Sequence, residues 1–127
     1  ASVTSDASLA DVNTLLGNSD IIALYGSNEH SANAIISAAE NHSEIGTGEG
    51  KVVAAGFDSG SAQIEAVKNG VLLGSITQAP VAMGEILVET LYKAANGEAV
   101  ADTDTGCQWY TAENIENPEI WDNLYGK

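Results

Sequence analysis

Residues 52–59 read Val-Val-Ala-Ala-Gly-Phe-Asp-Ser. The first four side chains are apolar without alternation, which is typical of a strand buried on both faces of a sheet. Gly56 ends the apolar run, and either Ser59 or Ser61 is placed to begin a helix. This stretch therefore predicts a strand of a parallel sheet followed by a crossover helix.

The same order of strand and helix continues on both sides of this stretch. The predicted strands cover residues 21–25, 52–55, 71–76 and 107–110. The first predicted helix is capped by Asp6 or Ser8 and ends at Leu16, and the second is capped by Ser27 or Asn28 and continues to Ala39. The third begins at Ser59 or Ser61 and ends at Asn69-Gly70, the fourth runs to Gly97, and one short helix is expected within residues 114–125. Pro80 lies in the first turn of the fourth helix, where its missing N–H leaves no hydrogen bond unmade. Alternating strands and helices with short connections predict an α/β fold, a parallel sheet with flanking helices.

The charge of the chain is strongly acidic. It has 18 acidic residues, four lysines and no arginine, and its net charge is -14. Nucleic acid is bound by cationic side chains that displace counterions from phosphates, and an anionic membrane surface repels acidic proteins. We therefore expect this segment to contact neither nucleic acid nor an anionic membrane surface.

Motifs for catalysis and cofactors are incomplete. Residues 46–51 are rich in glycine but fail the phosphate-loop pattern, and they lead into a strand instead of out of one. Residues 56–60 have Asp58 where a hydrolase elbow has its serine. Cys107 is the single cysteine, without a second thiol to complete a disulfide or a zinc site. We expect no cofactor, no metal site and no enzymatic activity.

Polar side chains follow three of the predicted strands. They are Asn28, Asp58 with its neighbour Phe57, and Gln78. Open parallel sheets bind ligands beyond the carboxyl ends of their strands. A carboxylate and two amides suit a neutral polyol, and Phe57 offers a flat apolar surface to a sugar ring. The alternative is that Asn28 and Asp58 only cap the helices that follow them.

Four motifs carry a resemblance to a known family. They are Tyr25-Gly26-Ser27-Asn28-Glu29, Gly56-Phe57-Asp58-Ser59, Ile76-Thr77-Gln78-Ala79-Pro80 and Asp104-Thr105-Gly106. Over about residues 4–121 the chain resembles the C-terminal portion of a type I, ribose-type periplasmic sugar-binding protein of an ABC transporter. LacI-type effector domains share the Gly-Phe-Asp motif. The resemblance implies a flavodoxin-like lobe with sugar contacts at Asn28, Phe57, Asp58 and Gln78.

The resemblance also implies a division of the chain. Residues 1–77 would belong to the second of two lobes. Residues 78–103 would be a hinge crossing and a helix that packs on the first lobe, and residues 104–127 a return crossing with an irregular C-terminal tail. The first lobe and the opening strand and helix of the second are missing, so we expect an incomplete sheet. Either the N-terminal lobe or self-association would then cover the apolar helix.

The function implied by the resemblance is that of a receptor. It would capture a small neutral sugar between two lobes and present it to the membrane permease of an ABC transporter. Its location would be extracytoplasmic, either periplasmic or lipid-anchored at the cell surface. The alternative is a sugar-sensing effector domain of a LacI-type transcription regulator. A signal peptide or lipoprotein cysteine upstream would support the receptor, and a helix-turn-helix would support the regulator.

Overall fold

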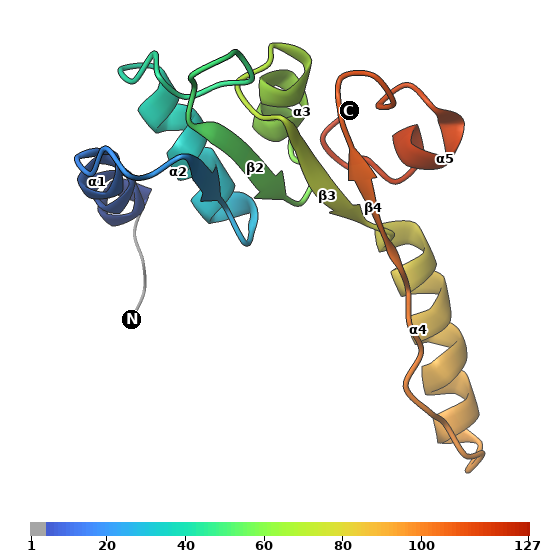
Figure 1. The fold of residues 1–127 in the computed structure, drawn as a ribbon. Coiled ribbons are helices and arrows are strands. Elements are labelled where there is room, and N and C mark those ends of the chain that lie inside the picture. The colour runs from blue at the N-terminus through green and yellow to red at the C-terminus, as the bar shows by residue number, and fades with distance from the viewer. Residues whose placement is uncertain (1–4) are drawn as a thin grey trace.

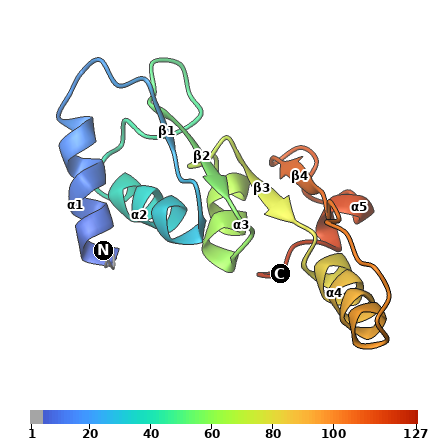
Figure 2. The same ribbon diagram turned by 90° about the horizontal axis from the view of Figure 1, so that it is seen from below.

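The structure, a computed structural model, describes residues 5–127, which form an α/β body with one projecting helix (Figures 1 and 2). The helices are α1 (Ser5–Leu16), α2 (Glu29–Ala39), α3 (Ser61–Lys68), α4 (Pro80–Ala95) and α5 (Pro118–Trp121). The strands are β1 (Ala23–Tyr25), β2 (Val53–Phe57), β3 (Gly74–Gln78) and β4 (Cys107–Tyr110). Residues 1–4 of the predicted second-lobe segment lie outside the described residues.

The strands form one four-stranded sheet in the order β1-β2-β3-β4. β1 pairs with β2 and β2 with β3 in parallel, whereas β4 runs antiparallel to β3. At the base of this last pairing, Gln78 lies opposite Cys107. The predicted α/β class with a mainly parallel sheet is confirmed, and β4 adds an antiparallel edge strand.

The predicted start of the third strand was wrong by three residues, because β3 begins at Gly74 and not at Val71. The backbone N–H groups of Val71 and Leu72 both donate to the carbonyl of Ala66, at 2.9 and 3.1 Å. Ala66 lies in the last turn of α3, where the backbone carbonyls of a helix have no partner within the helix. The two bonds supply that partner. The apolar run therefore begins with a turn in which Leu72 is buried, and only its second half enters the sheet.

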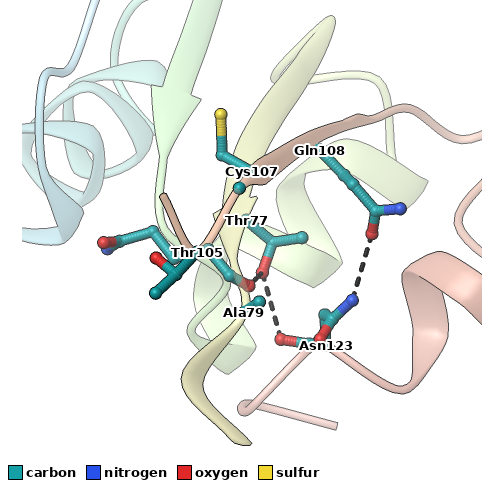
Figure 3. A pocket seen from close by; sticks show the side chains of 8 residues that line it. Thr77, Ala79, Thr105, Cys107, Gln108 and Asn123 are labelled. Atoms are coloured by element: carbon teal, nitrogen blue, oxygen red, sulfur yellow. Dashed lines mark hydrogen bonds between the residues drawn. The ribbon is translucent and has the colours of Figure 1, made fainter. Parts of the chain in front are cut away.

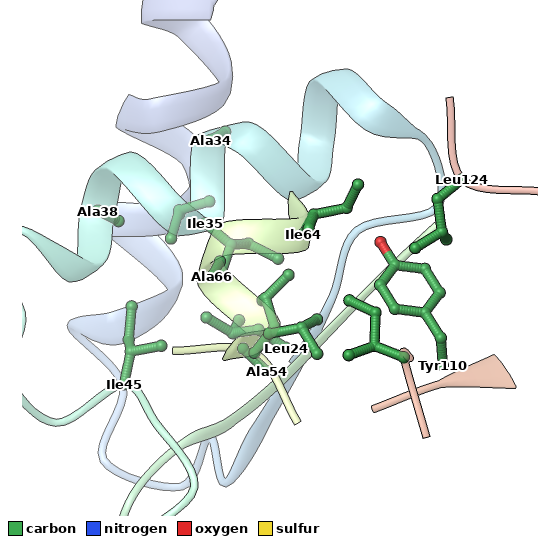
Figure 4. Close-up of a cluster of buried hydrophobic side chains, with 14 of the residues drawn as sticks. Leu24, Ala34, Ile35, Ala38, Ile45, Ala54, Ile64, Ala66, Tyr110 and Leu124 are labelled. Carbon is green, nitrogen blue, oxygen red and sulfur yellow. The ribbon is translucent and has the colours of Figure 1, made fainter. Parts of the chain in front are cut away.

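The hydrophobic core lies between the sheet and the helices α2 and α3 (Figure 4). Its large buried side chains include Leu24, Ile35, Ile64, Val67, Leu72, Tyr110, Ile115 and Leu124. Burial of each large apolar side chain contributes about 1.5–3 kcal/mol. Ile115 and Leu124 belong to the segment after β4, so this C-terminal segment is packed into the core despite its irregular backbone.

The opposite face of the sheet has no helix over it in either view (Figures 1 and 2). Successive side chains of a strand point to opposite faces, so the strand registers place one set of apolar residues there. The apolar residues of this open sheet face are Ala23, Tyr25, Val53, Ala55, Phe57, Ile76 and Trp109. Tyr25 remains 56% exposed and Trp109 41% exposed. A parallel sheet normally has both faces covered, so this face lacks its usual cover.

Helix α4 extends away from the body, and residues 96–106 run back beside it (Figure 1). None of its residues is buried. Val81, Val88, Leu91 and Tyr92 are each more than half exposed. No helix within residues 5–127 combines the length and apolarity needed to cross a membrane.

Candidate functional site

Asp58 lies directly after β2, at the carboxyl end of the sheet, and its side chain bonds to two other elements. Its Oδ1 accepts a hydrogen bond of 2.7 Å from the Nε2 of Gln78, the last residue of β3. Its Oδ2 accepts a bond of 3.2 Å from the backbone N–H of Glu29, the first residue of α2. The half-buried carboxylate thus joins the ends of two strands to the N-terminus of a helix, where negative charge is stabilised.

The backbone of Asp58 has an unusual conformation. Its φ is 81°, and it is the one non-glycine residue with positive φ among residues 5–127. Such a conformation is uncommon for residues with a side chain, although Asp tolerates it better than most. Its carbonyl accepts bonds from the Ser75 Oγ at 2.8 Å and the Tyr110 Oη at 2.9 Å. Ser75 and Tyr110 are fully buried, so they fix this carbonyl from inside the core.

Tyr110 is a permanent donor in this arrangement. Burial is the main cause that raises the pKa of Tyr110 to about 12, with smaller contributions from the negative charges of Asp58 and Glu29. The neighbouring Ser75 hydroxyl lowers the pKa in part. The hydroxyl therefore keeps its proton at neutral pH and continues to donate to the Asp58 carbonyl.

Asn28 caps α2, as the alternative interpretation of this residue predicted. Its Oδ1 accepts bonds from the backbone N–H of Ser31 at 2.9 Å and from the Ser31 hydroxyl at 3.0 Å. The Nδ2 of the exposed Asn28 side chain has no hydrogen-bond partner within residues 5–127. Capping by its oxygen therefore leaves the nitrogen of the same amide as a donor toward solvent.

Asp58 does not cap the helix that follows it. The N-cap of α3 is Gly60, whose backbone N–H donates to the Oε1 of Gln63 at 2.7 Å. The Nε2 of Gln63 donates to the carbonyl of Phe57 at 2.6 Å, so this buried glutamine fixes the loop that carries Asp58. The capping alternative is therefore wrong for Asp58 with respect to α3, although its carboxylate bonds to the first amide of α2.

The structure brings Asn28, Asp58 and Gln78 to one edge of the sheet, because Asp58 bonds both to Gln78 and to Glu29, the residue that follows Asn28. Phe57 precedes Asp58 and lies on the open sheet face, where it is half-buried. The set offers one carboxylate, two primary amides and an aromatic ring. Each amide can both donate and accept, and each carboxylate oxygen has more than one acceptor position. Such a set suits hydroxyl groups of a neutral ligand.

A pocket of about 310 Å³ adjoins this set where the chain leaves and re-enters the body (Figure 3). It is lined by Thr77, Gln78, Ala79, Thr105, Gly106, Cys107, Gln108 and Asn123. Figure 3 shows the side-chain amides of Gln108 and Asn123 turned toward each other, with a bond of 3.1 Å. Of the four predicted site residues Asn28, Phe57, Asp58 and Gln78, Gln78 alone lines this pocket.

Sequence reasoning missed Gln108, Asn123 and Glu29 as neighbours of the site. The motif at 104–106 indicated that the chain returns near the strand ends, which is where the pocket opens. Asn123 lies in a segment without hydrophobic periodicity, so the sequence held no signal for its position. Within residues 5–127 no cluster of His, Cys, Asp or Glu side chains is arranged to hold a metal ion.

Comparisons with known proteins agree on one family. Residues 2–99 match the family described as periplasmic binding protein domain. An ABC transporter solute binding protein from Agrobacterium vitis with bound D-fucose has 33% identity and a TM-score of 0.84 over 96% of this chain. A carbohydrate transporter solute binding protein from Agrobacterium radiobacter in complex with D-arabinose has 25% identity and a TM-score of 0.85 over 98%.

A third solved structure has a different description. It is an ABC transporter, LacI family transcriptional regulator from Brachyspira murdochii, with 33% identity and a TM-score of 0.80 over 96% of this chain. The chain spans about two fifths of these three proteins: 41%, 41% and 40% of their lengths. No curated protein sequence matches the chain. The TM-scores confirm the predicted architecture over nearly the whole chain.

Proposed function

Because the chain belongs to the periplasmic binding protein domain family, as its motifs predicted, we propose that it is part of a receptor for a small neutral sugar. Solved relatives include sugar-bound solute binding proteins of ABC transporters. The observation that carries the proposal is the Asp58 carboxylate, held between the Gln78 amide and the Glu29 N–H at the carboxyl end of the sheet. Family members bind solutes without transforming them, and the same role is proposed here.

The hydrogen-bonding capacity of the site supports a sugar ligand. Each Asp58 oxygen has one protein donor and keeps acceptor capacity for a further hydroxyl. The Nδ2 of Asn28 can donate to the ligand, and the Oε1 of Gln78 can accept, since neither atom has a partner within residues 5–127. Adjacent sugar hydroxyls would fill these positions, with the Phe57 ring contacting their C–H face.

The charge of the site favours a neutral ligand over a sugar phosphate. Asp58 and Glu29 are both acidic, and their side chains approach the same loop. The chain as a whole carries a net charge of -14. A phosphate group would meet unfavourable electrostatic potential at such a site. We therefore propose free pentoses, hexoses or related polyols as ligands.

The remainder of the receptor is proposed from the arrangement of α4. Residues 1–77 would form part of one lobe, and residues 78–103 would cross to the other lobe and pack α4 on it. Residues 104–127 would return and complete the sheet with β4 and the C-terminal segment. The exposed apolar side chains of α4 support this division, because such a helix usually packs against a partner surface. The receptor would be extracytoplasmic. It would hold the sugar between its lobes and pass it to a membrane permease.

A second candidate is the sugar-sensing effector domain of a LacI-type regulator. The solved relative from Brachyspira murdochii favours it, because its description names that family. In that case a separate DNA-binding part would be needed, since this segment has four lysines and no arginine. The upstream coding sequence separates the two: a signal peptide or lipoprotein cysteine supports the receptor, and a helix-turn-helix supports the regulator.

Calorimetric titration of the full-length protein tests the proposed ligand class and site. D-Fucose and D-arabinose are the probes, and D-ribose 5-phosphate is the charged comparison. Asp58→Asn keeps a side chain that tolerates positive φ but removes the charge, so the affinity should fall by about 1.5–3 kcal/mol. Asp20→Asn removes an exposed carboxylate near the opposite end of β1 and should bind as the natural protein does. Unchanged affinity in Asp58→Asn would remove Asp58 from the site.

A further inference from the structure

The last residues of the chain pack beneath the Asp58 loop. The backbone N–H of Gly126 donates to the carbonyl of Ser59 at 3.0 Å, and the N–H of Tyr125 lies 3.4 Å from the Ser59 hydroxyl. A Cβ at Gly126 would lie 2.2 Å from the backbone nitrogen of Ser61, so this approach requires glycine. The C-terminal segment is therefore fixed against residues 59–61, which follow Asp58 directly.

Tyr125 connects this segment to the start of α2. Its Oη donates to the Oε2 of Glu29 at 2.9 Å. The other carboxylate oxygen of Glu29 lies so close to Gly60 that a Cβ there would be 2.2 Å from it. The backbone N–H of the same Glu29 donates to the Oδ2 of Asp58. Glu29 is thus held by its side chain while its amide holds the site carboxylate.

The Tyr125 hydroxyl is a stable donor at neutral pH. Burial raises its pKa above the ordinary value, and the bond to Glu29 raises it further. Without this hydroxyl, the Glu29 carboxylate would lose its donor while remaining beside the negative charge of Asp58. Relaxation of the first turn of α2 would then move the amide that bonds to Asp58.

We propose that Tyr125 is a positioning residue for the ligand-binding carboxylate of Asp58, acting through Glu29. The inference rests on the proposed function, because Asp58 must contact the ligand for its position to matter. Residues 123–126 would then contribute to binding by positioning Asp58, although none of their side chains needs to contact the sugar. Thr77 supports the same segment, since its buried hydroxyl lies 3.1 Å from the Asn123 carbonyl.

A measurement without ligand tests the positional link in the full-length protein. Hydrogen exchange of the Glu29 amide, followed by NMR, should be at least threefold faster in Tyr125→Phe. Tyr92→Phe is the matched control, because this residue lies on α4, which projects away from Glu29 and α2 (Figure 1), and its hydroxyl has no partner within residues 5–127. The Glu29 amide should exchange at its natural rate in that variant. Equal exchange rates in Tyr125→Phe and the natural protein would overturn the proposal.

Titration with D-fucose and D-arabinose tests the effect on binding. Tyr125→Phe should weaken binding of the recognised sugar three- to tenfold, and Tyr92→Phe should leave it unchanged. In the Asp58→Asn background, Tyr125→Phe should have no further effect, because the residue acts through Asp58. The same fold-loss in both backgrounds would overturn the proposal. If neither sugar binds but the Glu29 amide exchanges faster, the proposed function is wrong and the link between Tyr125 and Glu29 is supported.

Discussion

The Nε2 of Gln78, the last residue of β3, donates a 2.7 Å hydrogen bond to the Oδ1 of Asp58, the first residue after β2. This bond fixes the orientation of the Gln78 amide, since its nitrogen must face the carboxylate. Its oxygen is then directed elsewhere and remains an acceptor. The two side chains therefore act as one unit that presents acceptors from both residues, with a donor supplied by Asn28.

Gln78→Glu should disrupt this unit. A second carboxylate would face Asp58 at hydrogen-bonding distance, and two such groups cannot both be ionised without strong repulsion. We expect one carboxyl of the pair to titrate well above its ordinary pKa, which carboxyl NMR would detect, and sugar affinity to fall at least tenfold at pH 7. Gln108→Glu adds the same charge beside Asn123 and should have a smaller effect. Unchanged affinity in Gln78→Glu would contradict the proposed pairing.

Stability should decrease at alkaline pH because of Tyr110. Its pKa is raised to about 12 in the folded state from an ordinary value of 10.0, so the folded protein retains a proton that the unfolded chain loses. The stabilisation is complete below pH 10 and is lost as the pH rises toward 12, by about 2–3 kcal/mol in total. Tyr125, whose pKa is also raised, acts in the same direction.

Urea unfolding at pH 9, 10.5 and 11.5 measures this loss. Tyr110→Phe should be less stable at pH 9 by about 1 kcal/mol, because the Asp58 carbonyl loses one of its two side-chain donors. It should also show a shallower decline at higher pH. Tyr92→Phe should keep the natural slope. An identical slope in Tyr110→Phe would show that Tyr110 ionises equally in both states.

Gly74→Ala should separate β4 from β3. An added Cβ would lie 2.4 Å from the Trp109 ring and 2.5 Å from the Tyr110 carbonyl, at the end of the pairing where Ser75 lies opposite Tyr110. Overpacking of this kind costs about 1–3 kcal/mol, which denaturant unfolding of the full-length protein would measure. Gly84→Ala in α4 is the matched control, since no described atom lies within 4 Å of the added methyl. That change should be neutral or stabilising, by up to about 1 kcal/mol.

The 127-residue chain should self-associate when it is produced alone. Two apolar surfaces are exposed, the open sheet face and α4, and apolar patches of this kind seldom remain in water on a monomer. The net charge opposes association, but salt screens that repulsion. Sedimentation at low micromolar concentration should show dimers or larger species, and a double change of Val88→Glu and Leu91→Glu should reduce them. A monomeric natural chain would contradict this expectation.

The sequence predicted the ends of β1 and β4, but β2 and β3 each end two residues later than predicted, so Phe57 and Gln78 are the last residues of their strands and do not follow them. The polar edge was still located, because two independent signals combine there. An apolar run without alternation locates a buried strand, and the polar residue after it marks the edge where ligands bind. That reasoning placed Asn28, Asp58 and Gln78 at one edge, where the structure has them. It could not separate a buried turn from a strand, so β3 was expected three residues too early.

The contacts supplied by the C-terminal segment were beyond sequence reasoning. Asn123 and Tyr125 lie where the backbone is irregular, and their positions depend on Leu124 and Ile120 packing into a core formed by distant residues. The sequence also could not predict the open sheet face. An apolar run indicates that a strand is buried on both faces, but it does not indicate which elements cover each face. Only the strand registers show that Tyr25 and Trp109 share the uncovered side.

The pairing of Gln78 with Cys107 means that residues 79–106, which contain the projecting helix α4, can be removed without disturbing the rest of the fold. Residues 79–106 begin directly after Gln78 and end directly before Cys107. Because Gln78 and Cys107 are paired in the sheet, the two ends of this segment lie next to each other. In an antiparallel pair, two residues such as Asn-Gly suffice to join the strands as a hairpin. Replacing residues 79–106 with such a turn would leave every strand of the sheet in place and remove the exposed helix. The same junction is the natural place to exchange this excursion for that of another member of the family, because both of its ends lie at one paired position.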